Sequence, residues 1–232
     1  YKGGIFMSIF NMDGPVFRFL NKMADLCILN LIFLLCCLPI ITIGASVTAL
    51  YSVTLKMSRD QEGYIARSFF KAFKANFKQA TSIWIPSLLL LFIMLADIRI
   101  YSSSNAGKYQ PLLIGAYLIF TLIAFMLSFA FPVLAKFKNT TGNIIKNAFL
   151  MGVGSFQWTL CILVILIVPT VLTLMIPASL SFIYMLWLLF GFALITLCTS
   201  YIFDYKIFPK YIKEEPSESS EEDSDSPDMT EN

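Results

Sequence analysis

Long apolar runs constrain this chain more than any other feature. Three of them, residues 112–135, 159–176 and 180–203, are about as long as the ~20 residues that a helix needs to cross the ~30 Å hydrocarbon core of a bilayer. A backbone in hydrocarbon must satisfy its own hydrogen bonds, which favours helices. Only 14% of the 232 residues are charged, compared with about 25% in soluble domains. The sequence therefore predicts an all-α integral membrane protein.

An internal repeat raises the expected number of crossings to six. Residues 63–77 (GYIARSFFKAFKANF) align with residues 142–156 (GNIIKNAFLMGVGSF) when the chain is shifted by 79 positions. In the same register, the weakly apolar stretch up to Met57 corresponds to the clear span that ends near residue 135, so we expect it to cross after a bend at Pro39. The predicted polytopic helical bundle, residues 19–206, has spans at residues 19–38, 40–57, 80–98, 111–135, 157–176 and 180–203.

The charge pattern predicts which side of the membrane each end of the chain occupies. Six spans place 15 of the 17 basic residues on one side, which the positive-inside rule assigns to the cytoplasm. Both termini then lie in the cytoplasm, and residues 1–18 form a cytoplasmic or interfacial segment. The two copies of the repeat have the same orientation in the membrane, so the repeat is parallel. Nine of the 15 acids lie in the last 19 residues. Residues 207–232 are therefore expected to be a disordered cytoplasmic tail, either plainly solvated or shielding the basic inner face.

The stretch 63–79 between two predicted spans is the most informative cytoplasmic segment. As a helix it would carry an aromatic stripe beside a basic face, because each set recurs every three or four residues. Such a helix could lie in the headgroup plane with its rings in the acyl boundary, or it could dock a second protein. The candidate docking residues are Arg67, Phe69, Lys71, Phe73, Lys74, Phe77 and Lys78.

Polar residues inside predicted spans are the candidates for a substrate pathway. Asn30 lies deep in the first span and needs a partner, which also suits a tie between helices. A bent, polar region follows around Pro39, with Thr42, Ser46 and Thr48. Small residues there also allow close helix packing, which is a sufficient structural explanation.

Nothing in the sequence resembles a catalytic site, and we expect the protein not to be an enzyme. It contains no histidine, which removes the commonest general base and metal ligand. The five cysteines lie in apolar runs without the spacing of a zinc or redox motif. We therefore expect no metal and no cofactor. Basic residues interleaved with Phe could suit nucleic acid, but a membrane surface explains them more simply, so no nucleic-acid partner is expected.

Residues 10–80 resemble the opening of the YesL-like proteins, integral membrane proteins of Gram-positive bacteria. The resemblance rests on the NMDGP start, the LNK–AD–LN spacing, LPIITIGA followed by TALY, and the block RSFFKAFKANFKQ. It implies a small multi-pass protein of the cell membrane that is associated with sugar ABC importers and carbohydrate use. It carries over no catalytic or binding residue.

Three functional hypotheses follow. The protein could be an accessory or permease-like subunit of a carbohydrate ABC importer, with permease and nucleotide-binding subunits as partners beside the lipid bilayer. It could instead be a stand-alone transporter or channel for a small solute that uses the bent polar hairpin. A membrane scaffold for a signalling partner is the third.

Overall fold

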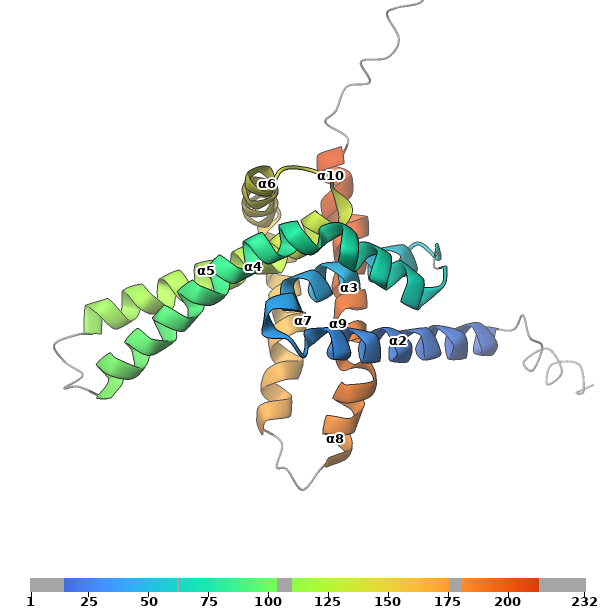
Figure 1. Ribbon diagram of the computed structural model, residues 1–232, viewed down its shortest axis with the longest axis horizontal. Coiled ribbons are helices and arrows are strands. Elements are labelled where there is room, and N and C mark those ends of the chain that lie inside the picture. The colour runs from blue at the N-terminus through green and yellow to red at the C-terminus, as the bar shows by residue number, and fades with distance from the viewer. Residues whose placement is uncertain (1–14, 62, 104–109, 176–180, 213–232) are drawn as a thin grey trace, which may run out of the picture.

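The computed structural model describes residues 15–61, 63–103, 110–175 and 181–212, and every regular element among them is helical (Figure 1). The helices follow one another along the chain with short connections. They are α2 (Pro15–Cys37), the 3-10 turn η1 (Ile40–Thr42), α3 (Ile43–Met57), α4 (Ile65–Ser103), α5 (Gln110–Lys136), α6 (Thr141–Gly154), α7 (Phe156–Met175), α8 (Ser181–Leu186), the π-helix η2 (Trp187–Gly191), α9 (Phe192–Ile202), the π-helix η3 (Phe203–Ile207) and α10 (Phe208–Ile212).

Six helical segments are long and apolar enough to cross a membrane, as the sequence predicts. They indicate a multi-pass α-helical membrane protein, and each contains or overlaps one predicted span. The six segments are Val16–Cys37, Ile40–Met57, Ile65–Asp97, Ile114–Lys136, Phe156–Thr173 and Tyr184–Ile212.

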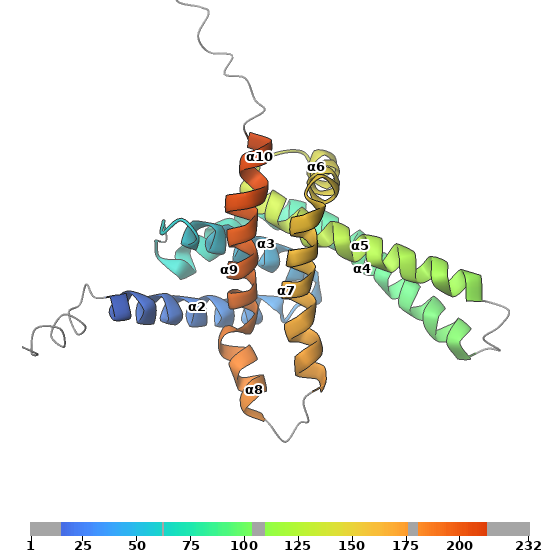
Figure 2. The ribbon, with the colours of Figure 1, turned by 180° about the vertical axis from the view of Figure 1, so that it is seen from behind.

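Helix α3 lies at the centre of the molecule, between α2, α4, α5 and α9 (Figures 1 and 2). Eleven of its fifteen residues are buried, many of them Gly, Ala, Ser or Thr. Small residues let neighbouring backbones approach closely, and this is the main source of helix association where lipid removes the hydrophobic drive. Gly44 shows the tightness, since a Cβ atom there would lie 2.6 Å from Cβ of Trp84.

The hydroxyl groups that make α3 only weakly apolar are satisfied inside the protein. Thr48 and Thr54 donate to the carbonyls of Gly44 and Leu50, one turn back along the helix. Thr54 also shares a 2.7 Å hydrogen bond with Ser200 of α9. Because these groups face other helices, α3 tolerates a polar composition that a lipid-facing helix would not.

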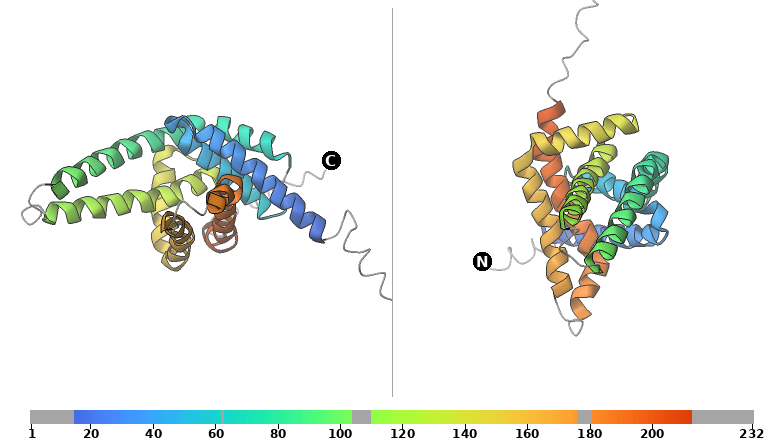
Figure 3. Two further views of the ribbon diagram at one scale, coloured as in Figure 1. Left: turned by 90° about the horizontal axis from the view of Figure 1, so that it is seen from below. Right: turned by 90° about the vertical axis from the view of Figure 1, so that its left-hand side faces the viewer.

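Two long hairpins extend from this centre in different directions (Figures 1 and 2). Helices α4 and α5 form one, and α7 forms the other with α8 and α9. Helix α6 joins the hairpins and lies across the end of α7 (Figures 1 and 3). Helix α10 ends beside α6, so the last described residues lie close to the link between the hairpins.

The structure corrects two predicted boundaries. The stretch 63–79 is not a separate helix, because α4 runs without a break from Ile65 to Ser103. The last helix continues past the predicted start of the tail at residue 207 and ends at Ile212. Phe208 explains the extension, since it is fully buried against the rings of Phe137 and Phe203. Residues 1–14 of the predicted segment 1–18, and the rest of the tail, residues 213–232, lie outside the described residues.

Candidate functional site

Asn30 ties α2 to the last membrane helix. Its side chain is fully buried, and Nδ2 donates to the carbonyls of Trp187 and Leu188 at 3.2 and 2.6 Å. Its Oδ1 accepts a hydrogen bond from the backbone N–H of Ala193 at 2.9 Å. The two carbonyls belong to the first residues of the π-helix η2, and Ala193 lies just after its end. A change from α to π geometry leaves backbone groups that need other partners. Asn30 therefore satisfies a local defect in the opposite helix.

The other candidate pathway residues lie at the bend between α2 and α3. Pro39 begins the turn, and Thr42 donates to the carbonyl of Cys36 at 2.6 Å. Ser46 donates to the carbonyl of Thr42 at 3.0 Å, and Thr48 lies further along α3 with its hydroxyl on Gly44. The structure thus brings Pro39, Thr42 and Ser46 together, while Asn30 faces the last helix. Their role in solute movement stays a prediction.

The bend and the Asn30 contacts lie outside the two cavities described below. The hydroxyls of Ser46 and Thr48 and the amide of Asn30 all belong to fully buried residues. Each is occupied by backbone groups of the same protein. These side chains therefore stabilise the fold through hydrogen bonds, whatever further role they have.

A charged cluster of Arg59, Lys136 and Asp204 was not predicted from the sequence. The Asp204 side chain is only 3% exposed, and Arg59 holds both of its oxygens, with Nε 2.5 Å from Oδ2. Nζ of Lys136 lies 3.5 Å from Oδ1, and Ser58 donates to Oδ2 at 3.4 Å. A lone acid at the end of the last apolar run was the available signal, because a buried carboxylate requires a cation.

This charged cluster joins the ends of α3 and α5 to the last membrane helix. Arg59 follows α3, Lys136 ends α5, and Asp204 lies in the π-helix η3. The hydrogen bond that Asp204 accepts holds the pKa of Arg59 above its ordinary value, against the opposite effect of burial. The hydrogen bonds to Asp204 therefore favour the charged form of the Arg59 guanidinium, as expected for a structural junction.

A second ion pair lies nearby in the loop after α3. Nζ of Lys22 in α2 is 2.7 Å from Oδ1 of Asp60, which is largely exposed. The hydrogen bond and the charge of Lys22 lower the pKa of Asp60, with a smaller contribution from Arg18. Asp60 adopts a positive φ of 52°, which Asp and Asn tolerate better than most residues.

The first half of α4 separates the predicted docking residues into two groups. Phe69 is fully buried and Phe73 is half-buried, and the two rings stack 6.2 Å apart against the α2–α3 side of the core. The prediction that this aromatic stripe reaches lipid or a partner is therefore wrong for Phe69. The rings do lie on one face of the helix, as their spacing predicts, but that face packs against α3.

The opposite side of the same helix forms an exposed basic face. It consists of Arg67, Lys71, Lys74 and Lys78, all of which are exposed and recur every three or four residues. Phe70 and Phe77 lie along its edge and are 45% and 37% exposed. This basic face is a surface with four cations and two accessible aromatic rings.

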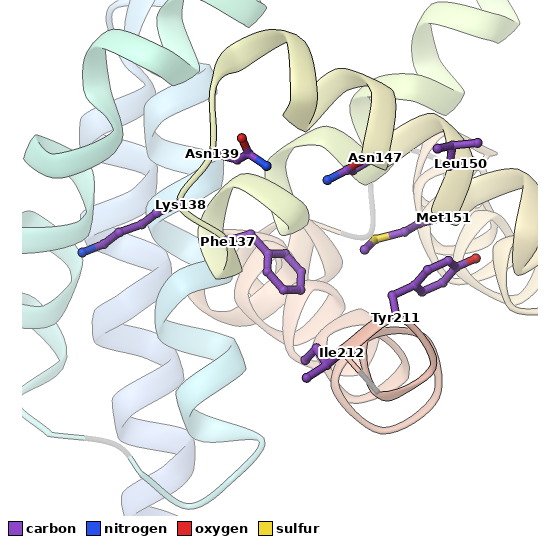
Figure 4. Close-up of a pocket in the computed structure, with 8 residues that line it drawn as sticks. All are labelled: Phe137, Lys138, Asn139, Asn147, Leu150, Met151, Tyr211 and Ile212. Carbon is purple, nitrogen blue, oxygen red and sulfur yellow. The ribbon is translucent and has the colours of Figure 1, made fainter. Parts of the chain in front are cut away.

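A cavity of about 700 Å³ lies between α6, α10 and the loop after α5, and is called the α6 cavity below (Figure 4). Asn139 and Asn147 extend toward one another across it, whereas Lys138 points away, toward α4 (Figure 4). The carbonyl of Asn139 accepts a 2.7 Å hydrogen bond from Nε2 of Gln79 in α4. The cavity is lined by Phe137, Lys138, Asn139, Asn147, Leu150, Met151, Tyr211 and Ile212.

A shallower hollow of about 540 Å³ lies between α2 and the start of α4, next to Asp25 and Tyr64. Within the described ranges, no group of three or more His, Cys, Asp or Glu is placed to hold a metal ion. Among the described residues, the basic face, the α6 cavity and this hollow are three surface features that could bind a partner or ligand.

A family model described as "Protein of unknown function, DUF624" matches residues 26–98. The match runs from α2 through α3 into the membrane part of α4, and it contains every candidate pathway and docking residue. Comparisons with curated proteins and with solved structures give no match. The matched residues include the basic face of α4.

Proposed function

We propose that this protein is a non-enzymatic membrane subunit that works with a carbohydrate ABC importer in the cell membrane, as an accessory or permease-like component. The basic face of α4 lies on the cytoplasmic side and docks the importer's nucleotide-binding subunit. Three observations support the proposal: the resemblance of residues 10–80 to YesL-like proteins, the family match over residues 26–98, and the excess of basic residues on one predicted side.

The observation that carries the proposal is the continuity of α4. This helix has 39 residues, which corresponds to a length of about 58 Å at 1.5 Å per residue. The hydrocarbon core is only about 30 Å thick, so a large part of α4 extends beyond it. The basic face occupies the first turns, and the same helix continues into a span. A partner bound to this face would hold one end of a transmembrane helix directly.

The burial of Phe69 and Phe73 favours a protein partner over the lipid surface. A helix that lies in the headgroup plane needs an apolar stripe in the acyl boundary. In α4 that stripe is packed against the α2–α3 side of the core, with Phe69 fully buried. The remaining face offers cations with two rings at its edge, which matches an acidic surface that has apolar pockets.

Affinity purification from native membranes tests this proposal. Three tagged forms are compared: the wild type, a basic-face variant and a control with the same change in net charge. In the basic-face variant Arg67, Lys71, Lys74 and Lys78 are changed to Gln. In the control the residues changed to Gln are Lys2, Lys56, Lys108 and Lys146.

We expect ABC permease and nucleotide-binding subunits to co-purify with the wild type and the control but not with the basic-face variant. Surface substitutions of this kind change the free energy of unfolding by about 0.5 kcal/mol or less each, so loss of the partner would not reflect misfolding. Isolation of the wild type alone, or equal recovery with the basic-face variant, would contradict the proposal. Recovery of a signalling protein in place of importer subunits would replace it with the scaffold hypothesis.

A further inference from the structure

We infer that the acidic segment 214–232 of this same chain docks on the basic face of α4 and competes there with the partner. The inference rests on the proposed function for the identity of that partner, and it adds a means of regulating the same face. The occupant is the chain's own C-terminal segment, and its recognition is electrostatic. Its acids are Glu214, Glu215, Glu218, Glu221, Glu222, Asp223, Asp225, Asp228 and Glu231.

The point where the described chain ends places the segment next to the basic face. Ile212 is the last described residue and lines the α6 cavity. Asn139 lines the same cavity, and its carbonyl accepts the hydrogen bond from Gln79 of α4. Gln79 directly follows Lys78, the last residue of the basic face. The α6 cavity therefore separates the start of the acidic segment from Lys78, the nearest cation of the basic face.

Cations continue along the route between these points. Lys138 is exposed and points from the loop after α5 toward α4 (Figure 4). Lys78, Lys74 and Lys71 follow at successive turns of α4, and all are exposed. In contrast, Lys210 at the start of the route is engaged, since its Nζ donates to the carbonyl of Gly154 at 3.0 Å. A run of accessible positive charge thus leads from the cavity onto α4, whereas α6 offers the single exposed cation Lys146 beside it.

The length and charge of the segment fit this surface. The 20 residues after Ile212 can span up to about 66–72 Å when extended. The basic face from Arg67 to Lys78 is only about 17 Å long. Nine acids in 19 residues place a negative charge at roughly every second position, so several can meet the four cations together. A run of like charges repels itself in isolation and gains most from an oppositely charged surface.

Tethering makes such weak contacts effective. Single exposed ion pairs are weak, but a tethered segment is present at an effective concentration in the millimolar range. Even a dissociation constant of that size covers the face about half of the time. An acidic partner must then displace the segment, so the segment sets the affinity threshold for docking.

Lysine acylation measured by mass spectrometry tests the inference without any partner. The full chain is placed in nanodiscs of uncharged lipid and treated with an uncharged acylating reagent. It is compared with a variant of equal length in which the nine acids are changed to Gln or Asn. We expect Lys71, Lys74 and Lys78 to react about twofold or more slowly in the wild type at low salt. At 1 M salt the difference should disappear, because the screening length falls to about 3 Å.

Lys146 of α6 is the control position, because it aligns with Arg67 in the internal repeat and is also exposed. Its rate should be the same in both forms. Equal rates at Lys71, Lys74 and Lys78 at low salt would overturn the inference, and so would an equal slowing at Lys146. Because no partner is present, failure here leaves the co-purification result untouched. If importer subunits do not co-purify with the wild type, but acylation of Lys71, Lys74 and Lys78 is still slowed, the result counts against the importer role alone.

Discussion

In the two copies of the internal repeat, α4 and α6 correspond to one another, and they bury the same side. Shifted by 79 residues, Ile65 of α4 corresponds to Ile144 of α6, and both are buried. Phe69 corresponds to Ala148, and both are fully buried. The element order also agrees, since α3 and α4 correspond to α5, α6 and α7. The similarity of sequence therefore reflects a shared pattern of packing against the preceding helix.

The exposed sides of the two copies differ in chemistry. Lys71 and Lys74 of α4 correspond to Leu150 and Val153 of α6, which are 51% and 54% exposed. One face therefore suits an aqueous, acidic surface, whereas the other suits lipid or an apolar contact. Equivalent exposed positions have diverged, so the basic face is a property of the first copy and not of the repeat.

The joint between the interfacial and spanning parts differs as well. Helix α4 is continuous through Ala75 and Asn76, whereas α6 ends at Gly154 and α7 begins after Ser155. Glycine lowers helix stability by about 1 kcal/mol relative to Ala. Thr159 stabilises the break, because its hydroxyl donates to the carbonyl of Gly152 at 2.8 Å. The basic face thus lies on a continuous helix, whereas a break in the helix follows the apolar face.

The largest expected effect comes from the charged cluster, which connects the two copies. Changing Asp204 to Asn leaves Arg59 and Lys136 without the carboxylate between them. We expect the free energy of unfolding to fall by about 3 kcal/mol, at the lower end for a broken buried ion pair because both cations are partly exposed. Titration with a denaturing detergent, followed by circular dichroism, measures the change.

A triple variant shows whether the lost charge balance is the cause. Replacing Asp204 with Leu, and both Arg59 and Lys136 with Met, removes every member of the cluster. Exchange of a complete buried ion cluster for apolar groups is often neutral, so this variant should recover most of the stability. Wild-type stability in the single variant would show that the two copies are held together by other contacts.

A smaller effect is expected at Gly152, where α6 meets α5. A Cβ atom there would lie 2.6 Å from Cζ of Phe125, so Gly152→Ala forces the ring to move. We expect a loss of about 1–2 kcal/mol in the free energy of unfolding, as is typical of overpacking. Gly142 in the same helix is the matched control, since a Cβ atom there meets nothing within 4 Å. Gly142→Ala should leave stability unchanged or slightly higher, and an equal loss in both variants would refute the packing explanation.

The smallest expected effect concerns Asp60, which corresponds to Asn139 in the second copy. Asp60→Asn introduces the residue of the second copy, tolerates the positive φ and removes the ion pair with Lys22. Because the pKa of Asp60 is lowered in the folded protein, its contribution to stability is present above the ordinary pKa of about 4. It is lost as the pH falls through the lowered value.

Melting temperatures of the wild type and the Asp60→Asn variant should therefore differ slightly but constantly between pH 5 and 7. The two should converge as the pH falls from about 4 through the lowered pKa of Asp60, where the carboxyl of the folded wild type becomes protonated. High salt should reduce the difference at neutral pH, because the pair is exposed. A difference that persists at low pH would mean that Asp60 acts through the loop conformation and not through its charge.

Local properties of the sequence were enough to locate the membrane helices. Hydropathy and length depend only on neighbouring residues, so the six segments could be predicted, including residues 40–57 with the help of the repeat. The spacing of Arg67, Lys71, Lys74 and Lys78 likewise places them on one face of a helix, because helical periodicity is a property of the sequence alone. The absence of histidine, the commonest general base and metal ligand, also follows directly from the composition.

Only the tertiary structure decided which face each helix buries and which polar groups meet. Asn30 contacts backbone groups more than 150 residues away, and Arg59 meets Asp204 at a separation of 145 residues. The periodicity of a single helix cannot predict such contacts, because they depend on how α3 packs between the hairpins. Phe69 faces inward for the same reason, because α3 packs on one side of α4 and the aromatic rings on that side are part of the core. The basic side chains on the other side stay exposed, so their charges need not be desolvated.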